Sequence, residues 1–489
     1  MRPRSLLVLT AVVLALAAFV WFFERKQPTT DEAKAEEKKV LAGVEADEVS
    51  EVSLAHEGTT VRLVREGGVK KKAGGDDAGK DEGAEADATF PEPSEWRLAA
   101  PMTARADRAA VEGLLSSVLG LEKARTLETA DRKEYGLAPP AAQVTLTTAE
   151  GKRTLEVGRE LAGTDQRAVA IAGEPAVHAV ASSFWSDLVK PAGDWRSREL
   201  FAGTREDVER VTLQHGPSRV LLARRGGEPW IEAPLADRAD AERFDQLLDA
   251  VASLSAIEFL DTPPPPPVDL GLDPPQDVIE VVRKAADGKP APKALRIGLG
   301  NALPHAEDAA EGEAGARYAE VDGQLVTVSA PALAEAASRA AEQWRSRNLT
   351  AFAVYEVDEL VARDGRGPLK LTRDDADWKR GNAKIFYGTV SDLLGALADA
   401  RAERVVDGAE AQRLAAGKPA LTLELVGAGG KKQTLTLWPA GAGGAAARAS
   451  GRDAVLLMPA SLPADLLQKI EAIRKAEPLK ETPTPTASP

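Results

Sequence analysis

Residues 49–68 read VSEVSLAHEGTTVRLVREGG, and residues 208–227 read VERVTLQHGPSRVLLARRGG. The two stretches align without a gap at an offset of 159 residues. In each, apolar and polar residues alternate on both sides of a glycine-containing turn, which predicts a hairpin with one buried face. The expected strands are Glu51–Leu54, Val61–Val64, Arg210–Leu213 and Val220–Ala223. The chain therefore contains copies of one unit that begins with a hairpin.

Tryptophans mark two further positions of the unit. Trp195-Arg196-Ser197-Arg198 recurs as Trp344-Arg345-Ser346-Arg347 at an offset of 149 residues. We expect this segment to lie where one unit ends and the next begins. A third short strand after each hairpin carries another tryptophan. We expect Trp96, Trp230 and Trp378 to be equivalent to one another.

A long helix follows this strand in every copy. Apolar residues recur with the i, i+3, i+4, i+7 spacing that lines one face of a helix. They are Val111, Leu114, Leu115 and Val118, then Phe244, Leu247, Leu248 and Val251, then Val390, Leu393, Leu394 and Leu397. Asp107 and Asp240 precede the first two helices and are the expected N-caps. Three more strands and a final helix complete each unit, so the predicted fold class is α+β with tandem repeats.

These matches divide the chain into segments. We place the repeats at 44–200, 201–350 and 351–475, with a mixed-charge, disordered insertion at about 69–95 in the first. The motif YGLAPP at 135–140 recurs as LGLDPP at 270–275, but the third repeat has no such motif. Residues 476–489 are rich in proline and threonine, and we expect them to be disordered.

The N-terminus predicts a membrane anchor. Residues 1–26 contain an apolar run from Ser5 to Phe23, which is long enough for a transmembrane helix. A signal peptide cleaved after Ala15-Leu16-Ala17 is the alternative, but the apolar run continues past that site. Residues 27–43 are expected to form a charged stalk. Basic residues flank both sides, and we favour an N-terminus inside and the bulk of the chain outside the bacterial cytoplasmic membrane.

Composition excludes several classes of function. The 489-residue chain has a formal net charge of −14, which disfavours nucleic acid as a partner. It has no cysteine, so thiolate catalysis, disulfides and cysteine-bound metals are excluded. Phosphate-loop, dinucleotide-binding and nucleophile-elbow motifs are also missing. We therefore predict no catalytic residues, no cofactor and no metal.

Three features remain as candidate sites. His56, His178, His215 and His305 are the only histidines and lack metal-binding spacing, so we interpret His56 and His215 as hairpin-turn residues and not as a site. The proline run at 263–267 reads as a stiff connector, with a polyproline ligand as the alternative. A ligand or partner contact is possible at Trp195, Arg196, Arg198, Trp344, Arg345 and Arg347. The structural alternative has the tryptophans fixing the repeat junctions and the arginines paired with carboxylates.

The order of these motifs resembles the DUF4340 family, a domain of unknown function. The anchor, the tryptophan before the long helix, the YGL-x-PP motif at 135–140 and the L-x-V-G motif at 155–158 carry the resemblance. It implies a single-pass envelope protein that is accessory to an ABC-type transporter or a complex similar to gliding-motility proteins. It supplies no catalytic residues.

We thus expect a non-enzymatic, membrane-anchored extracytoplasmic protein that binds an envelope partner. The first alternative is a module that binds envelope glycan or another anionic ligand through the Trp-Arg segments. The second is a hydrolase whose catalytic groups converge from distant parts of the sequence.

Overall fold

The chain divides into two compact units, Met1–Arg198 and Glu199–Pro489. The computed structural model describes residues 36–66, 95–127, 131–261, 263–285, 292–303, 315–351, 353–375, 377–439, 441 and 444–479. The predicted anchor at 1–26 lies outside these residues, as do nearly all of the predicted insertion and residues 480–489 of the predicted tail. None of the helices in the described ranges is long and apolar enough to cross a membrane.

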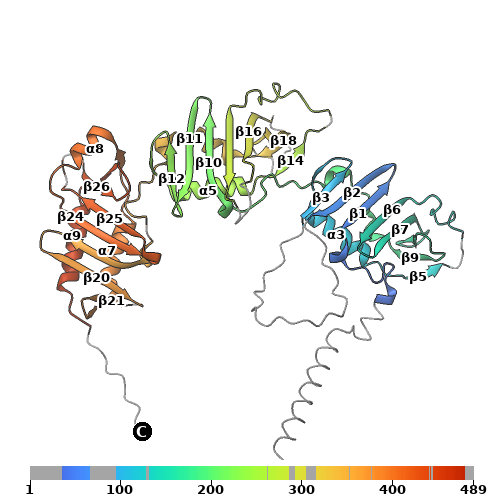
Figure 1. Cartoon of the computed structure of the whole chain (residues 1–489), viewed down its shortest axis with the longest axis horizontal. Helices are drawn as coiled ribbons and strands as arrows, with labels where there is room; N and C mark the ends of the chain where they lie inside the picture. Colours follow the sequence, from blue (N-terminus) through green and yellow to red (C-terminus); the bar gives the residue numbers. More distant parts are fainter. Residues whose placement is uncertain are drawn as a thin grey trace, which may run out of the picture. The chain divides into compact units, whose positions relative to one another are not determined.

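The first repeat is a nine-stranded antiparallel sheet with the order β4-β3-β2-β1-β6-β7-β8-β9-β5. Helix α3 (Arg108–Leu119) joins β4 to β5, which form opposite edges, so the chain crosses one face of the sheet (Figure 1). Helix α4 (Trp185–Leu188) follows the last long strand. The strands are β1 (Glu51–His56), β2 (Thr59–Glu66), β3 (Glu95–Ala100), β4 (Ala104–Arg105), β5 (Arg125–Leu127), β6 (Ala142–Thr148), β7 (Gly151–Glu160), β8 (Gln166–Ile171) and β9 (Val177–Ala181).

The second repeat has the same topology, with the order β13-β12-β11-β10-β15-β16-β17-β18-β14. Its helices are α5 (Ala241–Ala252) and α6 (Pro331–Ser338). The strands are β10 (Val208–His215), β11 (Ser218–Arg225), β12 (Glu228–Ala233), β13 (Asp237–Arg238), β14 (Ala256–Phe259), β15 (Asp277–Arg283), β16 (Leu295–Ala302), β17 (Ala316–Val321) and β18 (Gln324–Ser329).

The third repeat repeats the pattern, with the order β22-β21-β20-β19-β24-β25-β26-β27-β23. Its helices are α7 (Tyr387–Ala398), α8 (Gly408–Leu414) and α9 (Leu462–Lys475). Helix α8 stands between β23 and β24, where the first two repeats have the YGLAPP and LGLDPP motifs. The strands are β19 (Val357–Arg363), β20 (Pro368–Asp374), β21 (Asp377–Arg380), β22 (Ala383–Ile385), β23 (Arg404–Val406), β24 (Leu421–Gly427), β25 (Lys432–Leu437), β26 (Ala445–Ala449) and β27 (Val455–Met458).

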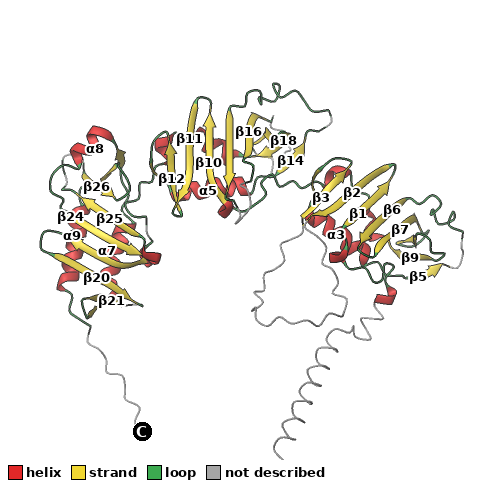
Figure 2. Cartoon of the chain, in the orientation of Figure 1, coloured by secondary structure: helices red, strands yellow, loops and turns green. Residues whose placement is uncertain are grey.

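The fold class is confirmed in its coarse form: three repeats of a mostly antiparallel sheet with few helices (Figure 2). In each sheet, one short strand precedes the long helix and another follows it. Neither of these two strands was predicted from the sequence. We predicted three strands after the helix, and the structure has four plus the short edge strand. The edge strands β4 and β13 have two residues each, too few for an alternating pattern.

The long helices cover one face of each sheet and form the cores with it. Leu114, Leu247 and Leu393 are 1%, 2% and 0% exposed, as their spacing predicts. Burying a leucine side chain stabilises a fold by about 1.5–3 kcal/mol. The predicted caps are also confirmed, since the Asp107 and Asp240 carboxylates accept hydrogen bonds from the N–H groups of Ala110 and Arg243. The shared apolar positions therefore fill interiors.

Each repeat starts with a leading segment that is bonded beside the end of its long helix. The N–H groups of Val40, Leu200 and Leu349 donate to carbonyls at 121, 254 and 400 over 2.8, 3.0 and 3.0 Å. Val40 and Leu41 are 5% and 1% exposed, so the folded part begins within the segment 27–43 that we expected to be a stalk. At the other end, Leu479 N–H bonds the carbonyl of Lys384 in β22, inside the segment that we expected to be a tail.

Candidate functional site

Trp195 and Trp344, the best-marked repeated residues, lie in the interior. Both are 0% exposed, at the ends of the 3-10 helices η3 (Ala192–Trp195) and η5 (Ala341–Trp344). The Trp195 carbonyl accepts a hydrogen bond from the N–H of Asp107 at 2.8 Å, and the Trp344 carbonyl from that of Asp240 at 2.7 Å. Each tryptophan therefore joins the end of its repeat to the start of that repeat's long helix.

The arginines of these segments divide into two kinds. Arg196 and Arg345 are 7% and 6% exposed, whereas Arg198 and Arg347 are exposed. The ligand-binding prediction needs the tryptophans and arginines at the surface, and only Arg198 and Arg347 are accessible there. For Arg345, the geometry is that of the structural alternative, in which the arginine pairs with carboxylates.

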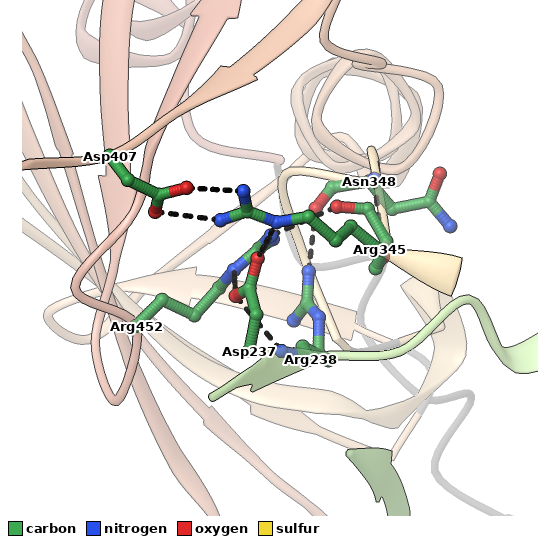
Figure 3. A network of polar contacts seen from close by, with 7 residues as sticks. Asp237, Arg238, Arg345, Asn348, Asp407 and Arg452 are labelled. Carbon is green, nitrogen blue, oxygen red and sulfur yellow. Dashed lines mark hydrogen bonds and ion pairs between the residues drawn. The ribbon is translucent and has the colours of Figure 1, made fainter. Parts of the chain in front are cut away.

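Arg345 lies in a network of charges that is buried except at Asp407 (Figure 3). Its Nε donates to Asp237 Oδ2 at 2.6 Å, and its Nη2 donates to Asp407 Oδ1 at 2.8 Å. Arg452 completes the network, because its Nε donates to Asp237 Oδ1 at 2.6 Å and its Nη2 to Asp237 Oδ2 at 2.9 Å. Asp237 is 0% exposed, so two guanidinium groups take the place of water around its carboxylate.

The network joins the second and third repeats. Asp237 and Arg238 form the edge strand β13 of the second repeat, and Arg345 lies just after η5. Asp407 precedes α8, and Arg452 lies in the turn between β26 and β27, so both belong to the third repeat. We call these five residues, Asp237, Arg238, Arg345, Asp407 and Arg452, the junction cluster.

Backbone carbonyls of the connecting segment are part of the same arrangement. Arg452 Nη2 donates to the Ser346 carbonyl at 3.0 Å, and Arg238 Nη2 donates to the Asn348 carbonyl at 2.5 Å. The segment that leads from one repeat into the next is thus held from both sides.

The electrostatics of the junction cluster follow from this burial. Burial by itself raises the pKa of Asp237, but hydrogen bonds and attraction from Arg452 and Arg345 outweigh it, and the pKa lies below its ordinary value. Burial lowers the pKa of Arg238 to about 10, and repulsion from Arg452 adds to that effect. Within the described part of the chain, Arg452 Nη1 is buried and has no hydrogen-bond partner. Removing one partner of such a buried pair costs about 3–5 kcal/mol, because the other charge stays buried.

Asp237, Asp407 and Arg452 were not among the residues predicted from the sequence. The aligned repeats contain one signal, because the position of Asp237 is occupied by Ala104 in the first repeat. A carboxylate that appears in one copy beside an otherwise shared arginine indicates a contact specific to that copy.

The expected equivalence of Trp230 with Trp96 and Trp378 is wrong by one residue. Trp96 pairs across the sheet with Arg65, and Trp378 pairs with the equivalent residue Arg373. In the second repeat the equivalent Arg224 pairs with Pro229, so Pro229 takes the tryptophan position. Side chains of neighbouring strand residues point to opposite faces.

Trp230 accordingly has different surroundings. Trp96 and Trp378 are each 1% exposed, whereas Trp230 is partly exposed. A Cβ added at Gly451, in the turn that carries Arg452, would lie 3.9 Å from Trp230 Cη2. Trp230 therefore lies beside the junction cluster and not in the core.

Phe244 compensates for the missing core tryptophan of the second repeat. The Arg65 guanidinium lies 4.7 Å from the ring centre of Trp96, and the equivalent Arg224 lies 5.4 Å from the ring centre of Phe244. Phe244 stands at the helix position of Val111 in the first repeat. A larger residue on the helix thus takes the space beneath the arginine.

The histidines of the described residues form no metal-binding cluster. His56 and His215 end β1 and β10 at hairpin turns, as predicted, and His215 Nδ1 lies 2.6 Å from Asp277 Oδ1. His178 is buried in β9, and His305 lies outside the described residues. In the residues that the structure describes, no group of three His, Asp or Glu side chains is placed to hold a metal ion.

Two open grooves occupy the same position in the first and third repeats. They measure about 650 and 630 Å³ and lie between the end of the long helix and the final helix. Ser183 and Asp187 line the first, and the equivalent Ser461 and Asp465 line the third. The second repeat has alanines, Ala332 and Ala336, at these positions. The repeats are therefore not interchangeable on this surface.

The comparison with protein families agrees with the order of motifs in the chain. The profile of a domain of unknown function, DUF4340, matches residues 96–275, from β3 of the first repeat to the LGLDPP motif of the second. The chain resembles the DUF4340 family. The DUF4340 match ends before the third repeat, which lacks the YGL-x-PP type of motif. No curated protein and no solved structure matches the chain.

Proposed function

We propose that the chain is a non-enzymatic interaction protein of the bacterial cell envelope. In this proposal, residues 1–26 anchor it in the cytoplasmic membrane and the three repeats lie on the extracytoplasmic side. There they hold an envelope protein, such as a component of an ABC-type transporter or of a gliding-motility-like complex.

One observation supports this proposal above the others: the residues shared by the repeats fill interiors and end the repeats. Trp195 and Trp344 are 0% exposed, and Arg345 is held by two carboxylates. Tandem repeats present extended surfaces, and repeat proteins use such surfaces to bind partners. The resemblance to DUF4340 supports the same assignment.

Affinity purification tests this function. The full-length chain, tagged at its C-terminus, is expressed in its native host, and membranes are solubilised in mild detergent. We expect a transporter or envelope component to be recovered with the chain at a constant ratio. Recovery of no envelope protein with a chain that keeps its native circular dichroism spectrum would overturn the proposal. A matched membrane protein with the same tag controls for non-specific recovery.

A further inference from the structure

An apolar surface lies at one corner of the third repeat. Among the described residues, five large apolar side chains are strongly exposed, and four of them belong to this repeat. They are Tyr355 at 75%, Phe386 at 63%, Tyr387 at 52% and Leu479 at 45% exposed. We call these four residues the aromatic corner. Exposed apolar patches of this kind mark interaction sites more often than scattered single residues do.

Hydrogen bonds and packing contacts place the four residues at the same end of the repeat. Phe386 and Tyr387 begin α7, and the Leu479 N–H donates to the Lys384 carbonyl, two residues before Phe386. Tyr355 lies in the 3-10 helix η6 (Val354–Glu356), next to α7, and Arg373 Nη1 donates to its carbonyl at 2.6 Å. The corner is therefore built by three segments that meet at the start of α7.

The position of Phe386 is specified by its neighbour. A Cβ added at Gly388 would lie 2.5 Å from Phe386 Cε1, so the ring lies against the first turn of α7. Because Gly388 has no side chain, the ring can occupy this place.

The first two repeats serve as internal controls for this corner. Phe386 stands at the N-cap position, where Asp107 and Asp240 accept hydrogen bonds in the other repeats, and it makes no such bond. Tyr355 and Tyr387 also have equivalents that are charged or small. These are Asp47 and Arg108 in the first repeat, and Glu206 and Ala241 in the second, all exposed. The fold does not need aromatic residues at any of these three positions.

We propose that the aromatic corner is the surface through which the third repeat binds its partner protein. The inference rests on the proposed function and names the surface that carries it. Replacing a capping aspartate with an exposed phenylalanine removes a stabilising bond and exposes apolar area. Aromatic side chains at exposed positions are enriched at the centres of protein interfaces, where they contribute most of the binding energy. The resulting loss of folding stability is offset when a partner covers the rings.

The charges around the corner indicate the chemistry of the partner. Among the described neighbours, carboxylates outnumber cations. Lys379 and Lys384 pair with Asp374 and Asp377, and Arg373 and Arg380 donate to backbone carbonyls. Among the described residues, the carboxylates Glu356, Asp375, Asp392 and Glu477 form no ion pair. An acidic rim repels an anionic lipid surface and attracts basic residues. The occupant is therefore a protein with an apolar patch and a basic rim.

The test replaces the aromatic corner with the residues of the second repeat. The variant Y355E/F386D/Y387A gives the third repeat the residues that the second repeat has at these positions, which are Glu206, Asp240 and Ala241. We expect its melting temperature to equal or exceed that of the wild type, because an N-cap is restored. We expect recovery of the envelope partner from solubilised membranes to fall at least tenfold. The control variant V268D removes the fifth exposed apolar side chain, in the second repeat, and should leave recovery unchanged.

A second measurement separates this surface from the proposed function. A photo-reactive phenylalanine analogue is placed at position 387 of the full-length chain in cells. A cross-link to the protein that the wild type recovers supports the corner. Equal recovery by the triple variant and the wild type overturns the corner but leaves the proposed function standing. If the wild type recovers no envelope protein, the proposed function fails. In that case the cross-link alone decides whether the aromatic corner binds a protein. A cross-link to another protein supports the proposal, whereas cross-links to lipid, to a second copy or to nothing overturn it.

Discussion

Arg345 and Arg347 lie two positions apart in one segment and have opposite environments. Arg345 is 6% exposed and bonded to Asp237 and Asp407, whereas Arg347 is exposed. The sequence Trp-Arg-Ser-Arg does not distinguish the two, because both fit an anion-binding segment equally well. The difference comes from the partners, and Asp237 is 108 residues from Arg345.

Alanine substitution of these two arginines separates a structural role from a binding role. We expect R345A to lower the free energy of unfolding by about 3–5 kcal/mol, because it leaves Asp237 buried with one partner fewer. The matched variant R347A should change it by less than about 0.5 kcal/mol. Urea unfolding of the purified chain, followed by circular dichroism, measures both. Equal effects of the two variants would mean that the junction cluster does not form.

Asp237 gives the junction cluster a defined pH dependence. Burial alone would raise its pKa, but Arg452 and Arg345 lower it below the ordinary value. A carboxylate of this kind stabilises the fold fully above its unfolded-state pKa, about 3.9, and loses that contribution as the pH falls through its folded-state pKa. We expect the stability difference between wild type and D237N to be constant from about pH 6 to 8 and to shrink below about pH 4. A difference that persists unchanged to low pH would contradict this assignment.

At the scale of elements, the long helices were predictable and the short strands were not. The spacing of Leu114, Leu247 and Leu393 follows the helical period, so the buried face could be predicted from the sequence alone. Strands of two or three residues, such as β4 and β13, carry no period. Trp230 was misplaced because it stands one residue further along β12 than Trp96 does along β3, and a short strand has no pattern that reveals such a step.

The N-caps of the long helices contribute measurably to the free energy of unfolding. Asp240 accepts a hydrogen bond from Arg243 N–H at 3.1 Å, and we expect D240A to lower the free energy of unfolding by about 1 kcal/mol. The exposed Gln246, on the same helix but away from its first turn, provides the control, and Q246A should cost less than about 0.5 kcal/mol. Thermal unfolding of both variants checks the difference. A cost for Q246A as large as that for D240A would argue against the cap.

At the scale of the whole molecule, duplication explains which residues are shared and which are not. Shared residues fill the cores and end the repeats. Residues specific to one copy, such as Asp237 and Phe386, form the junction and the exposed corner. Neither was predicted, because the junction joins residues 215 positions apart and the corner was recognisable only once equivalent positions had been aligned in space. The anchor at residues 1–26 and the envelope location stay predictions.

Cross-linking mass spectrometry on intact membranes tests the central claim, that the chain acts by holding an envelope protein, most directly. Cells that express the full-length chain at its native level are treated with a lysine-reactive cross-linker, and linked peptides are identified. The account predicts links between the third repeat and one transporter or envelope component, together with links within each repeat. Links confined to the chain itself, in cells where it is folded and abundant, would contradict it.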